Sequence, residues 1–203
     1  MCPQFTMAIG WLLVKKQEMT KIWKDNAFVA ATIAQVVPQE VVRVKTVDND
    51  GYQAIVVGTG KKEFPQKEKW QKIAWKRQVE FHTTQDYQPG AALTMDLLEG
   101  YDKVTVEGIS KGKWFQWVIK RHNFWWGPAS HGSKFHRGQG STGNRKPRRT
   151  LKGHPMAWRM WTDTITLKRV PIIDKFEQDG QQFVVFKGSL PGAYNQLLKI
   201  RLV

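Results

Sequence analysis

The organisation of the chain is decided by one stretch, residues 108 to 162, which reads GISKGKWFQWVIKRHNFWWGPASHGSKFHRGQGSTGNRKPRRTLKGHPMAWRMWT. These 55 residues hold twelve Lys and Arg but no acidic residue, since the acids stop at Glu107 and resume at Asp163. Removing these twelve charges from the +15 of the whole chain leaves +3 for the other 148 of its 203 residues. The charge therefore predicts a nearly neutral body and one basic segment of the kind that meets a phosphate backbone.

The composition of this basic segment narrows its role. It contains eight of the 17 glycines, four of the five histidines and six of the ten tryptophans. After Phe124 no apolar period is sustained, so the segment does not bury a face of its own. A solvated, disordered loop is one interpretation, but disordered linkers are poor in aromatic residues. Aromatic side chains between Lys and Arg suit bases and riboses as well as phosphates, so we favour nucleic-acid binding.

Outside the basic segment the sequence indicates a single β-rich body. With 41% hydrophobic residues the chain is long enough for one core. One cysteine, Cys2, excludes an internal disulfide framework and fits a reducing compartment. The apolar run at 7–14 is too short to span a bilayer and follows no basic region, so we expect a first buried strand ending at Lys15 rather than a secretory signal.

Short runs rich in β-branched residues and bounded by turn residues predict the remaining strands. They lie at 27–37, 41–47, 52–57, 79–82, 103–107, 164–176, 182–187 and 197–203. Strands this short and evenly spaced favour a closed, six-stranded type of β-barrel over a parallel sheet. We therefore assign 1–107 and 163–203 to a β-barrel body and 108–162 to an irregular insertion between two strands that pair with each other. The mixed-charge residues 61–77 predict an exposed excursion, with a short helix as the alternative.

Enzymatic chemistry finds little support in the sequence. Of the four histidines in the basic segment only His131 and His136 lie close together, no acid accompanies them and Cys2 is remote. The carboxylates Asp96 and Glu99 have no histidine or serine partner indicated by spacing, and no GxxxxGK[ST] loop occurs. We expect no metal, no cofactor and no catalysis, with the histidines acting as hydrogen-bonding and stacking groups.

Several motifs resemble one family. The runs SKGK at 110–113, VIKRHNF at 118–124, GPASHGS at 127–133, FHRGQGSTG at 135–143 and LKGHPMA at 151–157 resemble the universal large-subunit ribosomal protein three, the L-three family, of bacterial type. KKQEMTKIW at 15–23 is similar to the N-terminal signature of that family, and FVVFKGSLPGA at 183–193 is similar to its last hairpin. The similarity covers nearly the whole chain in the family's order.

This resemblance implies a structural, non-enzymatic component of the large ribosomal subunit. Its expected fold is a translation-protein-like β-barrel with a long, largely irregular extension that reaches towards the peptidyl-transferase centre. Its expected partners are large-subunit (23S-type) rRNA, bound early in assembly, and neighbouring large-subunit proteins, with no membrane and no small-molecule substrate. The expected location is the cytoplasmic rather than an organellar ribosome. The alternative is a free-standing nucleic-acid enzyme or accessory domain, such as a metal-dependent nuclease. A carboxylate cluster in the folded barrel that points at the base of the basic segment would favour it.

Sixteen basic and histidine side chains of the segment are the predicted rRNA contacts. The cations are expected to neutralise phosphates and the histidines to pack on sugars and bases. They are Lys111, Lys113, Lys120, Arg121, His122, His131, Lys134, His136, Arg137, Arg145, Lys146, Arg148, Arg149, Lys152, His154 and Arg159.

The sequence also departs from the family in ways that predict something testable. Gln139 stands where the family usually has Pro, no glutamine matches the one that some bacterial members methylate, and Met7 is a second plausible initiator. Six tryptophans stand where the family typically has Gly or is expected to have it: Trp114, Trp117, Trp125, Trp126, Trp158 and Trp161. One interpretation makes them stacking platforms for bases. We favour the hypothesis that the source organism reads the codon UGA as Gly, with Trp23 and Trp75 genuine.

Overall fold

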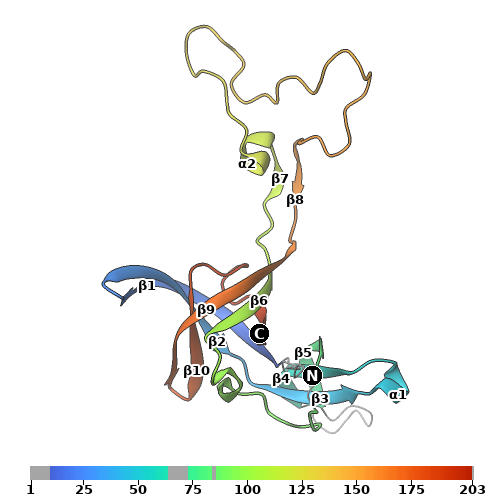
Figure 1. Ribbon diagram of the computed structural model, residues 1–203, viewed down its shortest axis with the longest axis vertical. Helices are drawn as coiled ribbons and strands as arrows, with labels where there is room; N and C mark the ends of the chain where they lie inside the picture. The colour runs from blue at the N-terminus through green and yellow to red at the C-terminus, as the bar shows by residue number, and fades with distance from the viewer. Residues whose placement is uncertain (1–9, 64–72, 84–85, 203) are drawn as a thin grey trace, which may run out of the picture. The chain divides into compact units, whose positions relative to one another are not determined.

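The computed structural model describes residues 10–63, 73–83 and 86–202, and it is mainly β (Figure 1). The chain divides into two compact units. The first, here called the body unit, is formed by the two parts Met1–Ile109 and Thr164–Val203. The second, here called the basic unit, is Ser110–Asp163.

Six strands of the body unit pair in a closed ring. They are β1 (Trp11–Lys24), β2 (Ala27–Val36), β6 (Lys103–Ile109), β9 (Thr164–Gln178), β10 (Gln181–Lys187) and β11 (Leu197–Leu202). The hydrogen-bonded order is β1-β11-β6-β9-β10-β2, every pairing is antiparallel, and β2 pairs back onto β1. The prediction of a mainly β chain with antiparallel strands is therefore confirmed.

A second sheet has three strands in the order β3-β4-β5. They are β3 (Gln39–Lys45), β4 (Ala54–Glu63) and β5 (Ile73–His82), and the short helix α1 (Val47–Asp50) fills the turn expected after β3. The exposed excursion predicted at 61–77 is shorter than expected. Residues at both of its ends belong to β4 and β5 and pair with each other, with Lys61 opposite Trp75. Alternating charges are compatible with a strand whose edges face water, and residues 64–72 lie outside the described residues.

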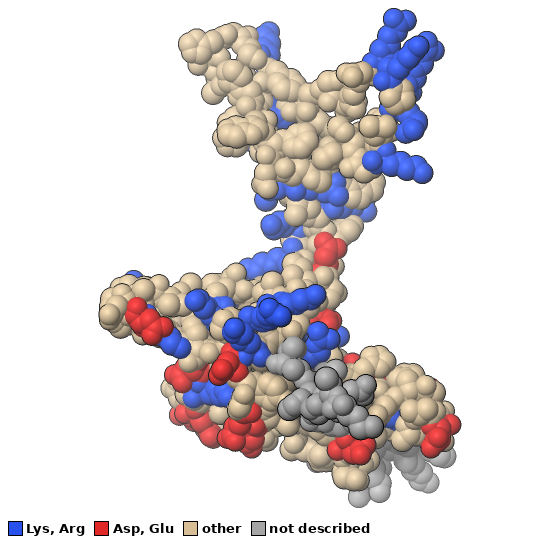
Figure 2. Space-filling view, viewed as in Figure 1, with Lys and Arg blue, Asp and Glu red and all other residues tan. Residues whose placement is uncertain are grey.

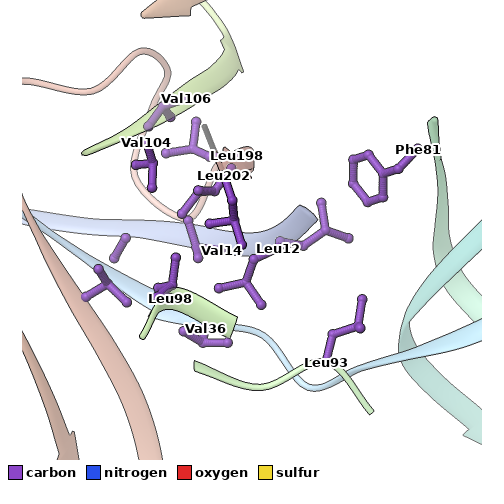
Figure 3. Close-up of a cluster of buried hydrophobic side chains, with 14 of the residues drawn as sticks. Leu12, Val14, Val36, Phe81, Leu93, Leu98, Val104, Val106, Leu198 and Leu202 are labelled. Atoms are coloured by element: carbon purple, nitrogen blue, oxygen red, sulfur yellow. The ribbon is translucent and has the colours of Figure 1, made fainter. Parts of the chain in front are cut away.

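The core follows from period-2 alternation in the strands. In β11, Leu198, Ile200 and Leu202 are buried, whereas the residues between them are partly exposed. Figure 3 shows Leu198 and Leu202 gathered with side chains of β1 and β6, and the same cluster takes in Phe81 from the second sheet. One hydrophobic core therefore serves both sheets of the body unit.

A buried amide ties the three-stranded sheet to the ring. The side chain of Gln39 is 3% exposed; its Oε1 accepts from the Leu13 amide at 3.0 Å and its Nε2 donates to the Leu13 carbonyl at 3.1 Å. The Trp11 ring stacks on Phe81 with centroids 4.7 Å apart, and its Nε1 donates to the His82 carbonyl. A glutamine in a core is stable because both ends of its amide are satisfied.

The end of the first strand differs from the one expected. The first strand does not end at Lys15 but continues to Lys24, with an irregularity after Lys16, because it forms a long hairpin with β2. The two turn residues of that hairpin, Asp25 and Asn26, have φ of 51° and 59°, which suits a two-residue turn. By contrast, the expected pairing of the strands that flank the basic segment is confirmed, since Ile109 lies opposite Thr164. Among the described residues, no helix combines the length and apolarity needed to cross a bilayer.

Candidate nucleic-acid interface

The basic unit begins and ends as a narrow two-stranded ladder. Strands β7 (Trp114–Gln116) and β8 (Trp158–Met160) pair antiparallel, and the helix α2 (Val118–His122) follows β7. Below them the Ser110 amide donates to the Asp163 carbonyl at 2.8 Å, and the Asp163 amide donates to Ser110 Oγ at 2.9 Å. Val118 is fully buried, so other residues pack closely around it at this end of the unit.

Side chains of helix α2 bind the main chain of the segment that leads into β8. Arg121 Nη1 donates to the Met156 carbonyl oxygen at 2.6 Å, and His122 Nε2 lies 3.2 Å from the same oxygen. The helix ends at Asn123, whose φ of 58° is one that Asn tolerates and whose amide donates to the Val118 carbonyl. Because the unit contains no acidic residue before Asp163, main-chain carbonyls take the place of carboxylates as partners for these side chains.

The loop after α2 folds around Phe135. The Gly127 amide donates to the His136 carbonyl at 2.9 Å, and His136 Nδ1 lies 2.7 Å from the Pro128 carbonyl oxygen. A Cβ added at Gly127 would lie 2.0 Å from the Phe135 carbonyl oxygen, and one added at Gly138 would lie 2.4 Å from the Phe135 ring. The two glycines are therefore required by close approach to the same residue.

Beyond Gly138 the chain forms the most exposed part of the unit. Gln139 Nε2 donates to the Pro155 carbonyl at 3.0 Å, and every residue from 140 to 153 is exposed. This exposed stretch holds four closely spaced cations: Arg145, Lys146, Arg148 and Arg149. Sequence reasoning marked Gln139 only as a departure from the family and did not find its bond.

Of the sixteen predicted contact residues, thirteen are exposed and three are partly buried: Arg121, His122 and His154. Figure 2 shows Lys and Arg spread over the basic unit, while most of the Asp and Glu that it shows lie on the body unit. The four ion pairs formed by described residues all lie in the body unit. The exposed cations of the basic unit are therefore not neutralised by carboxylates of that unit, which is the electrostatic state that a polyanion would relieve.

The structure brings only some of the predicted contacts together. The cations of residues 145–149 share one exposed stretch, and Arg121 and His122 share one carbonyl. Arg137 and Arg159 lie over tryptophan rings, at 5.9 Å from Trp126 and 5.0 Å from Trp161. Among the described residues, no three His, Cys, Asp or Glu side chains gather closely enough to hold a metal ion.

The six tryptophans of the basic unit form no core. Their side chains are between 47% (Trp161) and 94% (Trp125) exposed, and Trp114 meets Trp161 edge to face with centroids 5.3 Å apart. Trp114 also has φ of 57°, a backbone conformation that side chains disfavour and glycine accepts. These surroundings agree with either interpretation of the six positions, as stacking platforms or as glycines.

Comparison with known proteins identifies the family of the chain. No family model matches the sequence. The large ribosomal subunit protein uL3 of Streptococcus pyogenes serotype M1 is 37% identical over 199 residues, covering 94% of this chain and 95% of the relative. The uL3 proteins of Streptococcus agalactiae serotypes Ia and V show the same identity over the same shares. The similarity runs through the body and the basic segment alike, and the chain therefore belongs to the family of the bacterial large ribosomal subunit protein uL3.

Proposed function

We propose that this protein is a structural constituent of the large ribosomal subunit that binds large-subunit rRNA directly through its basic unit. The observation that carries the proposal is the set of thirteen exposed basic and histidine side chains in a unit whose sole acidic residue is Asp163, at its end. The relatives support the assignment, because their name places them in the large subunit.

Counterion release gives the physical basis of binding. Each phosphate that a Lys or Arg neutralises frees condensed counterions, so affinity depends steeply on salt. Exposed aromatic rings between the cations add surfaces on which bases stack. In this proposal the ring of six strands in the body unit corresponds to the translation-protein-like barrel that the resemblance implies, and the body unit contributes less to affinity.

Finer features of the proposal come from the resemblance to the family. They are binding early in subunit assembly, an extension that reaches towards the peptidyl-transferase centre, contacts with neighbouring large-subunit proteins, and a place in the cytoplasmic ribosome. The exposed glycine-rich stretch 140–153 supports such contacts, since chain of this kind allows close approach to an RNA backbone.

A salt series tests the proposal. We expect log affinity of the full chain for large-subunit rRNA to fall with log salt at a slope of about −4 to −9, as six to ten phosphate contacts would give. A slope of about −2 or shallower would contradict the phosphate-binding role.

A matched pair of fourfold Gln variants locates the contacts. Replacing the cations of the exposed stretch should make the slope shallower by about 3; they are Arg145, Lys146, Arg148 and Arg149. The control removes four exposed cations of the body unit and should leave the slope nearly unchanged; they are Lys24, Lys103, Lys168 and Lys187. Equal effects from the two variants would show that binding follows total charge rather than the basic unit.

A further inference from the structure

Three side chains of the basic unit converge on two consecutive carbonyls. The Pro155 oxygen accepts from Gln139 Nε2 at 3.0 Å, and the Met156 oxygen lies 2.6 Å from Arg121 Nη1 and 3.2 Å from His122 Nε2. Their donors come from helix α2 and from the edge of the exposed stretch, 16 to 35 residues away in sequence. Pro155 and Met156 are thus the residues whose carbonyls hold two distant parts of the unit to the segment that leads into β8.

Several other cations of the unit have no such side-chain hydrogen bond. Lys120, the neighbour of Arg121 in α2, is exposed and has no side-chain hydrogen bond or ion pair among the described residues, whereas Arg121 is partly buried. Lys134 and the four cations of residues 145–149 resemble Lys120 in this respect. The predicted contacts therefore include two kinds of side chain: those hydrogen-bonded within the unit and those free to bind a ligand.

On the basis of the proposed function, we propose that Arg121 and Gln139 are positioning residues, which fix the shape of the rRNA-binding surface through Pro155–Met156. Lys120 and the exposed cations supply the phosphate contacts. The link through Arg121 is short and charge-assisted, and it uses a donor whose charge is retained under all physiological conditions. The link through Gln139 is open to this chain because Gln has an amide donor, which the Pro expected from the family lacks.

Like-charge repulsion explains why such links matter for binding. The cations of the unit repel one another and face no carboxylate there, so the free unit tends to open. Links to carbonyls hold the irregular loops without neutralising the exposed cations. A surface ordered before binding loses less conformational entropy when the RNA arrives, and affinity rises accordingly.

Two variants with matched charge separate positioning from contact. Lys120→Gln and Arg121→Gln each remove one positive charge from adjacent residues of α2. Lys120→Gln should make the salt slope of rRNA binding shallower by about 0.7 to 0.9 and leave amide hydrogen exchange at 156–158 unchanged. Arg121→Gln should leave the slope unchanged, lower affinity about tenfold through loss of a charged hydrogen bond, and speed exchange at 156–158.

Gln139→Ala provides a test without any change of charge. It should lower affinity about fivefold, as the loss of one neutral hydrogen bond does, with an unchanged slope and faster exchange at 156–158. Arg121→Lys retains the charge and a donor, and it should recover part of the affinity that Arg121→Gln loses. The thermal midpoint of the body unit, measured alongside, should be the same in every variant, since none of these residues belongs to it.

The outcomes distinguish this inference from the proposed function. If Arg121→Gln reduces the slope as much as Lys120→Gln and leaves hydrogen exchange unchanged, Arg121 is a phosphate contact and the inference is wrong. An unchanged affinity in Gln139→Ala would also overturn it for that residue. If the unmodified chain itself shows a slope of about −2 or shallower, the proposed function fails, while hydrogen exchange still decides whether Arg121 and Gln139 hold the unit together.

Discussion

Replacing all six tryptophans of the basic unit by glycine separates their two interpretations. The structure allows the cost in stability to be worked out. At Trp114, glycine relieves a side chain held at φ of 57°, which costs about 1–2 kcal/mol for an L-residue. It also removes the edge-to-face pair with Trp161, worth about 0.5–1.5 kcal/mol. These two effects nearly cancel, and the other four side chains are at least 61% exposed, so little burial is lost. The variant also loses the contacts of Arg137 with Trp126 and of Arg159 with Trp161, which are worth about 1–2 kcal/mol together at exposed sites.

The expected change in RNA binding is much larger and differs in sign between the two interpretations. If the indoles are stacking platforms, six of them at a minimum of about 1 kcal/mol each amount to about 6 kcal/mol, or a loss of more than about 10⁴-fold in affinity. If the positions are glycine in the native protein, the sixfold Trp→Gly variant should bind at least as tightly as the unmodified chain, because glycine lets the backbone approach the RNA. We expect the second result.

Binding of large-subunit rRNA at one fixed salt concentration measures the difference. A sixfold Trp→Phe variant is the control, since it keeps a planar ring at every position and should retain any affinity that stacking supplies. A loss of about 10⁴-fold or more in the Gly variant alone would refute the glycine hypothesis. Two independent checks are available: the six codons should be UGA while genuine tryptophans are UGG, and peptide mass spectrometry of the native ribosome should report Gly.

Three further predictions concern the body unit. Replacing residues 113–160 by a short Gly-Ser linker should leave a soluble β-protein with one cooperative unfolding transition and most rRNA affinity lost; aggregation would show that the basic unit contributes to the core. Phe186→Ala should lower the free energy of unfolding by about 3–5 kcal/mol in urea titration, because Phe186 is fully buried; a change below about 1 kcal/mol would contradict the assigned core. The pKa of Glu80 is lowered by hydrogen bonds from Lys45 and then Tyr52, so its contribution to stability is present above the pKa of an unfolded Glu and is lost as pH falls through the lowered value. Tyr52→Phe should raise the pKa of Glu80 towards its ordinary value in an NMR titration of the carboxyl carbon, and an unchanged value would refute the assignment.

Local patterns in the sequence identified most strands but few of their partners, the pairing of the two strands that flank the basic segment being an exception. Leu198, Ile200 and Leu202 alternate visibly, and the strand that contains them was expected. The three-stranded sheet was not distinguished from the ring, because β3 and β4 contain short runs rich in β-branched residues, as ring strands do. One link between the two sheets is the buried amide of Gln39, a long-range contact to Leu13 that no local pattern reports.

The charge of the basic unit was visible in the sequence, but its internal bonds were not. The absence of acidic residues from 108–162 can be seen in the composition. Every residue has a main-chain carbonyl, however, so an acceptor such as the Met156 carbonyl leaves no signal in the sequence. His122 and His136 were expected to contact RNA, and the structure shows each within hydrogen-bonding distance of a carbonyl of the unit. Their contact with RNA stays a prediction. Gly127 and Gly138, on either side of Phe135, were the one available signal of close packing.

The pairing of Ile109 with Thr164 has a consequence for how this chain can change over time. To the strands β6 and β9, the 54 residues of Ser110–Asp163 are the connection of a hairpin. The entropic cost of closing a loop rises by about 0.6 kcal/mol for each doubling of the loop length. A connection of this size therefore lowers the folding stability of the body unit by only about 2 kcal/mol more than a connection of seven residues. Insertions and deletions in the connection are therefore nearly neutral for folding. Evolution can lengthen, shorten or replace this connection without loss of the body fold. The same segment should be transferable to the hairpin of an unrelated β-protein.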